Sequence, residues 1–500
     1  MREFAQTLSE FTKGLRPDAN TPRNSGFATE LYNTRCGVAG LEVPPLIVYP
    51  ISGSPTVSWP LPQLVKIKGL TTGQTDLFFL TSSNPQYLYR VNANYSLSCE
   101  NVGGLALNLG VPGRYTIADF GWYQIWHKLA VPKTILYRVY DDDLMAWQWK
   151  KLTDGGEVSL ADITCVCNFR GQLIAGILTS TDSSDGTRSY MVVWSEIGSV
   201  TPSIMFSTLQ GYIDRRTGVG GLAVQPYKRT SGNYKVGPNS VVHRILPLGN
   251  GVMVYCSDRI FYMKAVSLPE PTFGIVPIAS FGIPSTFCAE GDESEHIFIS
   301  SNKEIWRVKE GPKPERLGHK EYMDLLTGTI IISRNPNFGD YYISNGSKTY
   351  LLSQYGLSQW FQYPTSLVWE DANKRLIGPI AVGADVSAYM ASDVFDFGVR
   401  GLKTLTVMEI GSTGQVMTAN VDYKYKVIDS AFTASRFKTA SGFGAVTPLV
   451  SGTEFKMRVK GADYTKFDLD YLTVRYKYID KRMIRGVYAT DAKVLSRSGR

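Results

Sequence analysis

The chain has 500 residues, which is enough for a sizeable core and for more than one domain. Glycine (47 residues), tyrosine (29) and phenylalanine (22) are abundant, as is typical of strands and tight turns, and no long stretch shows sustained helical spacing. No apolar run approaches the roughly 18 residues of a membrane span, and Met1–Lys13 lacks a signal-peptide apolar region. We expect an all-β protein that is used without secretion or stable membrane insertion.

The formal net charge is +8, and most of the excess lies in Ser451–Arg500, where twelve Lys/Arg face six Asp/Glu. This segment predicts contact with nucleic acid or with the acidic surface of another protein, although a solvated face is the plain alternative. Four tyrosines of this segment could stack on bases, although strand packing is the more frequent role: Tyr464, Tyr471, Tyr476 and Tyr478. In Tyr471–Ile479, however, Tyr476 and Tyr478 alternate with Arg475 and Lys477, which indicates strand packing instead.

Residues 1–60 hold many glycines and prolines, too many chain breakers for an independent core. We predict an extended N-terminal arm that crosses the following domain or a neighbouring subunit. Within it, Leu46–Tyr49 has the composition of a short strand that can close a ring.

A short apolar hairpin with a polar turn recurs along residues 61–390. The clear copies are Leu77–Val91, Val254–Met263, Ile297–Val308 and Tyr342–Leu352, and the looser ones are Tyr123–Tyr140 and Leu173–Trp194. Their second strands centre on Tyr89, Tyr137, Trp194, Tyr262, Trp306 and Leu351, at intervals of 48, 57, 68, 44 and 45 residues. A propeller blade has roughly 40–50 residues, so the spacing predicts a β-propeller of about six blades, with a large sandwich as the alternative.

The two long intervals predict inserted loops at Asp182–Ser189 and Gly211–Asn239. The second loop is glycine-rich and basic, and its length indicates a partner contact. Its candidate interaction residues are Arg215, Arg216, Lys228, Arg229 and Lys235.

Longer alternating strands follow at Leu402–Ile410, Thr418–Val427, Glu454–Val459 and Tyr471–Ile479. They predict a separate C-terminal β-sandwich-like domain over residues 391–490, followed by a basic tail at 491–500. Leu376–Tyr389 fits the last blade or the linker equally well. Lys481, Arg482 and Arg485 are further candidate interaction residues.

Signals for catalysis, cofactors and metals are weak. The four histidines have no matched nucleophile or acid nearby in sequence, and Gly218–Ala223 matches a dinucleotide fingerprint without a preceding apolar strand. Cys165 and Cys167 share a strand face but have no second ligand pair, so we interpret them as core residues. We predict a non-enzymatic protein without a cofactor or metal. Acids contributed by different blades could still form a hydrolase site without leaving a local motif.

Several motifs resemble those of bacteriophage tail-nozzle proteins, also described as tail hub or packaged-DNA stabilisation proteins. They are Phe11–Asp18, Pro22–Phe27, Val192–Gly198, Gly251–Met263, Asp396–Thr406 and Asp480–Gly486. The Gly211–Asn239 insertion departs from simpler relatives. The resemblance implies a β-propeller virion protein of a short-tailed phage, usually a homohexamer, made in the host cytoplasm and incorporated into the tail.

The implied function is to attach below the portal and adaptor rings, close the DNA channel, and let the genome pass on infection. Implied partners are other copies of the chain, portal and adaptor proteins, tail fibre or spike proteins, and packaged double-stranded DNA bound without sequence specificity. The alternative is a glycan- or receptor-binding propeller with Trp59, Trp122, Trp126, Trp147, Trp149 and Trp360 as sugar platforms, or less readily a propeller hydrolase.

Overall fold

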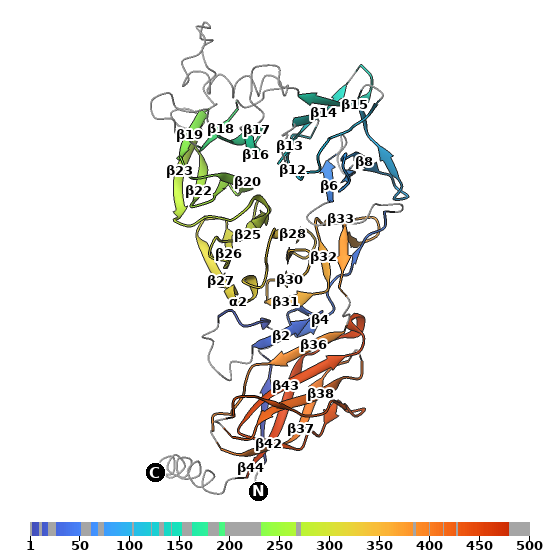
Figure 1. Cartoon of the computed structure of the whole chain (residues 1–500), viewed down its shortest axis with the longest axis vertical. Coiled ribbons are helices and arrows are strands. Elements are labelled where there is room, and N and C mark those ends of the chain that lie inside the picture. The colour runs from blue at the N-terminus through green and yellow to red at the C-terminus, as the bar shows by residue number, and fades with distance from the viewer. Residues whose placement is uncertain are drawn as a thin grey trace.

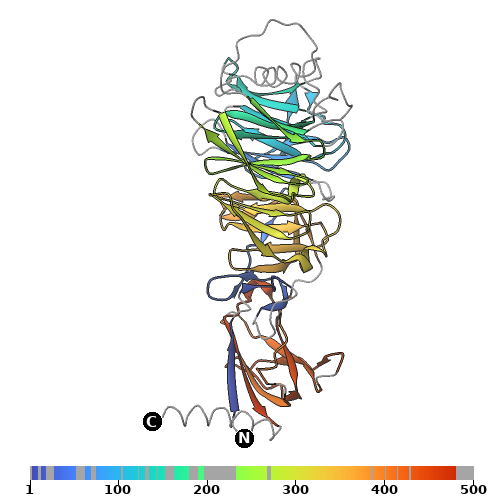
Figure 2. The same ribbon diagram turned by 90° about the vertical axis from the view of Figure 1, so that its left-hand side faces the viewer.

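The computed structural model is an elongated all-β molecule with a ring of sheets at one end and a smaller sandwich at the other (Figures 1 and 2). The structure describes residues 3–9, 13–18, 27–51, 62–68, 75–102, 105–121, 123–129, 135–141, 143–152, 163–178, 190–195, 232–266, 272–383, 387–399, 401–413, 415–426 and 429–479. Within these residues no helix is both long and apolar enough to cross a bilayer.

Five sheets of the ring are antiparallel and have four strands in simple chain order. The first sheet contains β6 (Gln63–Lys68), β7 (Thr75–Leu80), β8 (Leu88–Val91) and β9 (Leu97–Cys99). The second contains β12 (Tyr115–Asp119), β13 (Tyr123–Lys128), β14 (Ile135–Asp141) and β15 (Ala146–Leu152). The third is β16 (Ile163–Phe169), β17 (Gln172–Leu178), β18 (Tyr190–Trp194), β19 (Gly232–Gly237). The fourth is β20 (Val242–Leu248), β21 (Gly251–Cys256), β22 (Ile260–Val266), β23 (Thr272–Ala279), and the fifth is β24 (Ala289–Gly291), β25 (Glu295–Ile299), β26 (Ile305–Lys309), β27 (Pro314–Gly318).

A sixth set of four strands is part of a larger sheet, and two small sheets complete the ring. The sixth set is β28 (Ile331–Asn335), β29 (Asp340–Ser344), β30 (Thr349–Leu352) and β31 (Leu357–Trp360). The small sheets are β33 (Val368–Glu370), β34 (Arg375–Ile377) and β5 (Ile47–Val48), and β32 (Gln362–Pro364) with β35 (Ile380–Val382). The described minor elements of the ring are β10 (Asn101–Val102), β11 (Leu105–Ala106), the 3-10 turn η3 (Thr286–Cys288) and α2 (Lys320–Met323).

The predicted β-propeller and its hairpins are confirmed. Each of the six predicted anchor residues lies in the third strand of one of the six four-stranded sets. The hairpin pattern did not predict the small seventh sheet, because one of its strands comes from residues 47–48. The interval Gly211–Asn239 is also not wholly a loop, since its end forms β19, the outer strand of the third sheet.

The ring closes between β33 and β6. The backbone N–H of Leu64 donates to the hydroxyl of Ser366 at 2.7 Å, and Lys66 Nζ lies 3.0 Å from a carboxylate oxygen of Asp371. A small apolar cluster that includes Leu64, Phe79 and Val368 packs across the same seam. The predicted strand around residues 46–49 is present and pairs in parallel with β34, beside this closure.

The C-terminal domain consists of two facing sheets, and its four predicted long strands are confirmed. One sheet contains β1 (Glu3–Leu8), β44 (Tyr471–Tyr478), β37 (Lys403–Gly411), β41 (Ala445–Val446) and β42 (Val450–Gly452). The other contains β36 (Ala388–Ser392), β43 (Glu454–Gly461), β38 (Thr418–Lys424), β39 (Thr433–Ala434) and β40 (Lys438–Thr439). Met408, Met457 and Val474 are buried in one core cluster with both sheets, while the turn η4 (Tyr464–Lys466) contacts Trp360 of the ring.

The described parts of the predicted N-terminal arm, residues 1–60, add strands to sheets of both the sandwich and the ring. β1 pairs with β44 along its full length, and β2 (Ala28–Tyr32) lies between β31 and β36 (Figure 1). The pairing of β2 with both β31 and β36 makes one ten-stranded sheet that runs from the ring into the sandwich. The short pair β3 (Arg35–Cys36) and β4 (Leu41–Glu42) lies near the same junction. Glycines and prolines prevent an independent core, but they still permit short strands that complete other sheets.

Candidate functional site in the propeller centre

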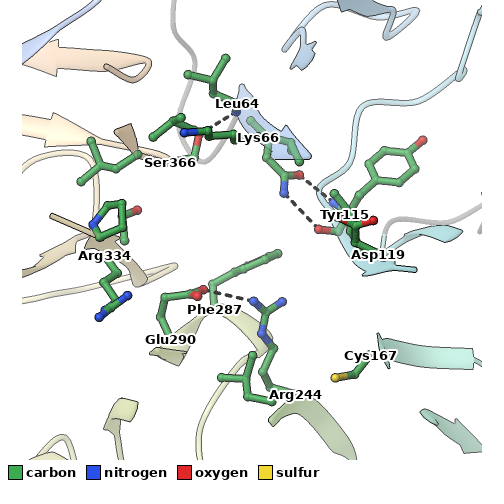
Figure 3. Close-up of a pocket in the computed structure, with 18 of the residues that line it drawn as sticks. Leu64, Lys66, Tyr115, Asp119, Cys167, Arg244, Phe287, Glu290, Arg334 and Ser366 are labelled. Atoms are coloured by element: carbon green, nitrogen blue, oxygen red, sulfur yellow. Dashed lines mark hydrogen bonds and ion pairs between the residues drawn. The ribbon is translucent and has the colours of Figure 1, made fainter. Parts of the chain in front are cut away.

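A cavity of about 940 Å³ lies at the centre of the propeller (Figure 3). Residues of the innermost strands β6, β12, β16, β20, β24, β28 and β33 line it, so each four-stranded set and the small sheet of β33 contribute to its wall. The ring topology brings these residues together although they span residues 63–369. Pockets of roughly 300–1,000 Å³ are typical of small-ligand sites, so we treat this cavity as the candidate functional site.

Side-chain hydrogen bonds join neighbouring sheets around the cavity. The amide of Gln63 donates to the carbonyl of Tyr115 at 3.1 Å and accepts from the Tyr115 N–H at 2.9 Å, so it replaces a backbone pair between two sheets. The amide of Asn168 donates to the carbonyl of Asp119 at 2.6 Å. These contacts hold the cavity wall in a defined shape because each one joins strands of different sheets.

Three basic side chains of the wall have close carboxylate partners. Arg244 Nη2 lies 3.1 Å from Glu290 Oε2, and Figure 3 shows the two side chains facing each other. Arg334 Nη2 lies 2.5 Å from Asp292 Oδ2. Lys66, at the seam, pairs with Asp371. Each pair links two different sheets or two sides of the seam, so the charges also fix the relative positions of the sheets.

Arg114 is the most buried charged group of the wall, at 8% exposure. Its guanidinium carbon lies 4.5 Å from the ring centroid of Phe287, a residue of η3 between the fourth and fifth sheets. Arg114 directly precedes β12 of the second sheet, so its side chain reaches across the cavity. Burial, followed by the positive charge of Arg244, lowers the pKa of Arg114, and Glu290 only partly opposes this shift.

Three carboxylates face the cavity from different parts of the ring: Asp119, Glu290 and Glu293. Asp119 accepts a hydrogen bond from the N–H of Gly121 at 2.8 Å, so it caps its own turn. Glu290 pairs with Arg244, and Glu293 is exposed. Acids from separate sheets therefore line one cavity, and Glu290 is the one that pairs with an arginine of the wall.

Two histidines of the propeller, His296 and His319, are buried among packed side chains. His296 is fully buried, and its Nε2 donates to the carbonyl of Pro247 at 2.8 Å while Nδ1 accepts from the Tyr255 hydroxyl at 2.9 Å. Burial lowers the pKa of both His296 and His319 to about 4. Both imidazoles are therefore neutral at pH 7 and serve packing.

The interpretation of Cys165 and Cys167 as core residues is confirmed. Both are buried in the cluster between the third and fourth sheets, and burial raises the pKa of the Cys167 thiol to about 12. The described residues contain no group of three or more His, Cys, Asp or Glu side chains that could hold a metal ion.

Most candidate interaction residues lie outside the described residues: Arg215, Arg216, Lys228, Arg229, Lys481, Arg482 and Arg485. Lys235 is described and is exposed on β19, the outer strand of its sheet. It does not line the central cavity. The structure therefore does not bring Lys235 together with the cavity residues.

Of the six tryptophans predicted as possible sugar platforms, four lie within the described residues and two do not. Trp126, Trp149 and Trp360 are buried, and Trp147 is half-buried against Arg138, whose guanidinium carbon lies 4.1 Å from its ring centroid. These four residues are packing residues, which corrects the platform hypothesis for them. Trp59 and Trp122 lie outside the described residues.

Sequence reasoning missed the cavity residues, among them Arg114, Arg244 and Glu290. Each stands alone in the sequence, in or beside a short strand, without a motif. One available signal was a charged residue in or next to the first strand of a repeat, where a propeller directs side chains towards its axis.

The class of protein that the fold defines is the β-propeller. No family model and no curated protein matches the chain. Three solved structures illustrate the structural likeness. An exo-β-1,3-galactanase from Phanerochaete chrysosporium is 9% identical with a TM-score of 0.30, covering 75% of this chain and 98% of that one.

The other two solved structures have similarly low sequence identity and TM-scores. PorZ, a surface component of the type-IX secretion system of Porphyromonas gingivalis, is 12% identical with a TM-score of 0.34, covering 84% of this chain and 51% of that one. A putative 6-phosphogluconolactonase from Bacteroides uniformis is 12% identical with a TM-score of 0.31, covering 78% of this chain and 99% of that one. Such likeness concerns the fold alone and carries no argument about activity.

Proposed function

We propose that the chain is a structural protein of a short-tailed bacteriophage virion, a nozzle or hub subunit that closes the DNA channel below the portal and adaptor rings. Several copies, six in this proposal, surround the tail axis, with the six-blade repeat and its closing sheet as the body of each subunit. The sequence motifs that resemble tail-nozzle proteins are the starting point of the proposal.

The observation that carries the proposal is the ten-stranded sheet that joins the ring to the sandwich through β2. Independent domains usually meet through a flexible linker, whereas here backbone hydrogen bonds continue across the junction. The carbonyl of Lys13 also approaches Gly356 so closely that a Cβ there would lie 2.1 Å from its oxygen. A subunit that resists the pressure of packed DNA needs such a rigid connection, because bending at the junction would open the channel.

Native mass spectrometry and negative-stain imaging of the full chain, alone and mixed with an adaptor ring, test this proposal. We expect a sixfold ring, or a monomer that becomes sixfold on the adaptor, because heterologous contacts of identical subunits close into rings. A protein that stays monomeric and does not bind the adaptor would contradict the tail role.

The alternative function is a glycan- or receptor-binding propeller, or a propeller hydrolase. The central cavity favours this alternative, since acids from separate parts of the ring face it. Hydrolysis of a panel of aryl glycosides by the full chain, compared with Asp119→Asn and Glu290→Gln, separates the two functions. Turnover that both variants abolish would support a hydrolase. Absence of turnover would support the structural role.

A further inference from the structure

We propose that the central cavity binds a small organic anion, whose carboxylate or phosphate group lies between the guanidinium groups of Arg114 and Arg244. The inference does not depend on the proposed tail role. It rests on two arginines from different sheets, one nearby carboxylate, and a cavity large enough for a ligand.

The two arginines reach the same place from separate sheets. Arg114 enters from the second sheet and lies over Phe287, while Arg244 enters from β20 of the fourth sheet and contacts Glu290. Phe287 and Glu290 are close in sequence, at the start of the fifth sheet. The guanidinium groups of Arg114 and Arg244 therefore meet near one short segment of the cavity wall.

The local balance of charge favours an anion. At Arg114 the repulsion from Arg244 outweighs the attraction of Glu290, and burial keeps water from screening it. Both arginines stay protonated at neutral pH, so two positive charges lie at this part of the cavity wall in the free protein. An added carboxylate or phosphate would offset the repulsion and accept hydrogen bonds from both guanidinium groups.

The other charged side chains of the cavity wall have their own ion pairs, cap a turn or are exposed. Asp292 neutralises Arg334, and Asp371 neutralises Lys66. Asp119 caps its own turn, and Glu293 is exposed at the rim. Arg114 and Arg244 are therefore two basic groups of the wall that lie near the same carboxylate, Glu290.

The cavity volume and the apolar part of the wall indicate the rest of the ligand. About 940 Å³ exceeds what an inorganic ion fills, and Leu246, Phe287 and Trp369 offer apolar surface beside the polar groups. An acidic sugar has this chemistry, since it combines an anionic group with a ring that has apolar faces and hydroxyl groups. Uronic acids and sugar phosphates share that chemistry.

Isothermal titration of the full chain with three matched hexoses tests the proposal: D-glucuronate, D-glucose 6-phosphate and neutral D-glucose. We expect at least one acid to bind about tenfold or more tightly than glucose, since charge-assisted hydrogen bonds add this much. The acid that binds identifies the anionic group. Equal affinity for glucose, or no binding of either acid at millimolar concentrations, would overturn the proposal.

Three variants locate the site. Arg244→Gln should weaken binding of the acid roughly tenfold or more. Glu290→Gln should strengthen it severalfold, because it removes a carboxylate that competes with the ligand. Arg334→Gln is the matched control and should change the affinity less than about twofold, because Asp292 already neutralises that arginine.

The expected gain in affinity in Glu290→Gln, opposite to the loss in Arg244→Gln, distinguishes a ligand site from a purely structural ion pair. An Arg244–Glu290 pair that only joins the sheets would make Glu290→Gln less stable without strengthening binding. Thermal unfolding of each variant checks that it is folded. If Arg244→Gln does not fold, the test of the site is whether Glu290→Gln binds the acid more tightly than the parent chain. An unchanged or weaker affinity in Glu290→Gln, or an equal loss in Arg334→Gln, contradicts the site.

Discussion

The six four-stranded sets and the composite sheets are held together in different ways. Each four-stranded set comes from one stretch of chain, as in β20–β23, and successive hairpins form it. The seventh sheet joins β5 to β34, and the C-terminal sheet joins β1 to β44, where the hydroxyls of Thr7 and Thr473 are 2.9 Å apart across 466 residues of sequence. The repeated sets therefore provide the bulk of the ring, while the composite sheets provide its closure and its connection to the sandwich.

The largest effect should follow from a cavity inside a repeated set. Trp126 is fully buried and packs edge-on against Phe78 and Trp149. Trp126→Ala should lower the free energy of unfolding by about 3–5 kcal/mol, measured by urea denaturation followed by circular dichroism. Trp147→Ala, at a half-buried position, is the control and should cost clearly less. Equal losses for both variants would mean that burial does not determine the stability of this sheet.

A smaller effect is expected in the composite seventh sheet. The buried amide of Gln362 accepts from the N–H of Ile47 at 2.9 Å and donates to its carbonyl at 2.8 Å. Gln362→Leu keeps the volume but leaves both backbone groups unpaired, at a cost of about 2–4 kcal/mol in unfolding free energy. Hydrogen exchange should show faster exchange at residues 47–48, whereas the exposed control Gln354→Leu should not. Unchanged protection there would show that β5 is held without this amide.

The pH dependence of stability compares a repeated set with the N-terminal segment. His296 belongs to the fifth sheet, while the N–H of His319 donates to the carbonyl of Pro17 at 2.7 Å. Each imidazole has a folded pKa of about 4, below the ordinary 6.5, so the unfolded chain binds more protons between these values. Stability should be full above pH 6.5 and fall by about 1–3 kcal/mol per histidine as the pH decreases towards 4.

Denaturation of His296→Gln and His319→Asn at pH 7 and pH 5 measures how much each histidine contributes to the loss of stability at acidic pH. Asn tolerates the left-handed backbone of position 319, where φ is 59°. Each variant should lose less stability than the parent chain over this pH interval. A parent-like slope in both variants would assign the acid sensitivity to other groups.

The smallest effect is expected at the seam of the ring. The carboxylate of Asp371 is largely exposed beside Lys66, so Asp371→Asn should lower the stability only slightly, and less at high salt than at low salt. Thermal unfolding at low and high salt measures it. A loss as large as that of Gln362→Leu would mean that the seam depends on this ion pair more than on its apolar cluster.

The sequence predicted most of the repeated architecture because hairpin partners are neighbours in the chain. All six anchors, from Tyr89 to Leu351, lie in third strands, and Tyr476 and Tyr478 face inward as expected. The pairing of the composite sheets could not be predicted in this way: the strand around residues 46–49 was expected, but its partner β34 is far from it in the sequence. Nor could the cavity be predicted, since Arg114, Arg244 and Glu290 meet only after the ring has formed.

The pairing of β1 with β44 has a consequence for how the protein is made. The ribosome produces Glu3–Leu8 before the other described strands, yet their partner strand, Tyr471–Tyr478, is the last described strand to be translated. At roughly 5–20 residues per second, β1 waits on the order of a minute for that partner. Meanwhile the repeated sets can fold one after another as they emerge, and β1 can complete the sandwich only after Tyr471–Tyr478 has been translated.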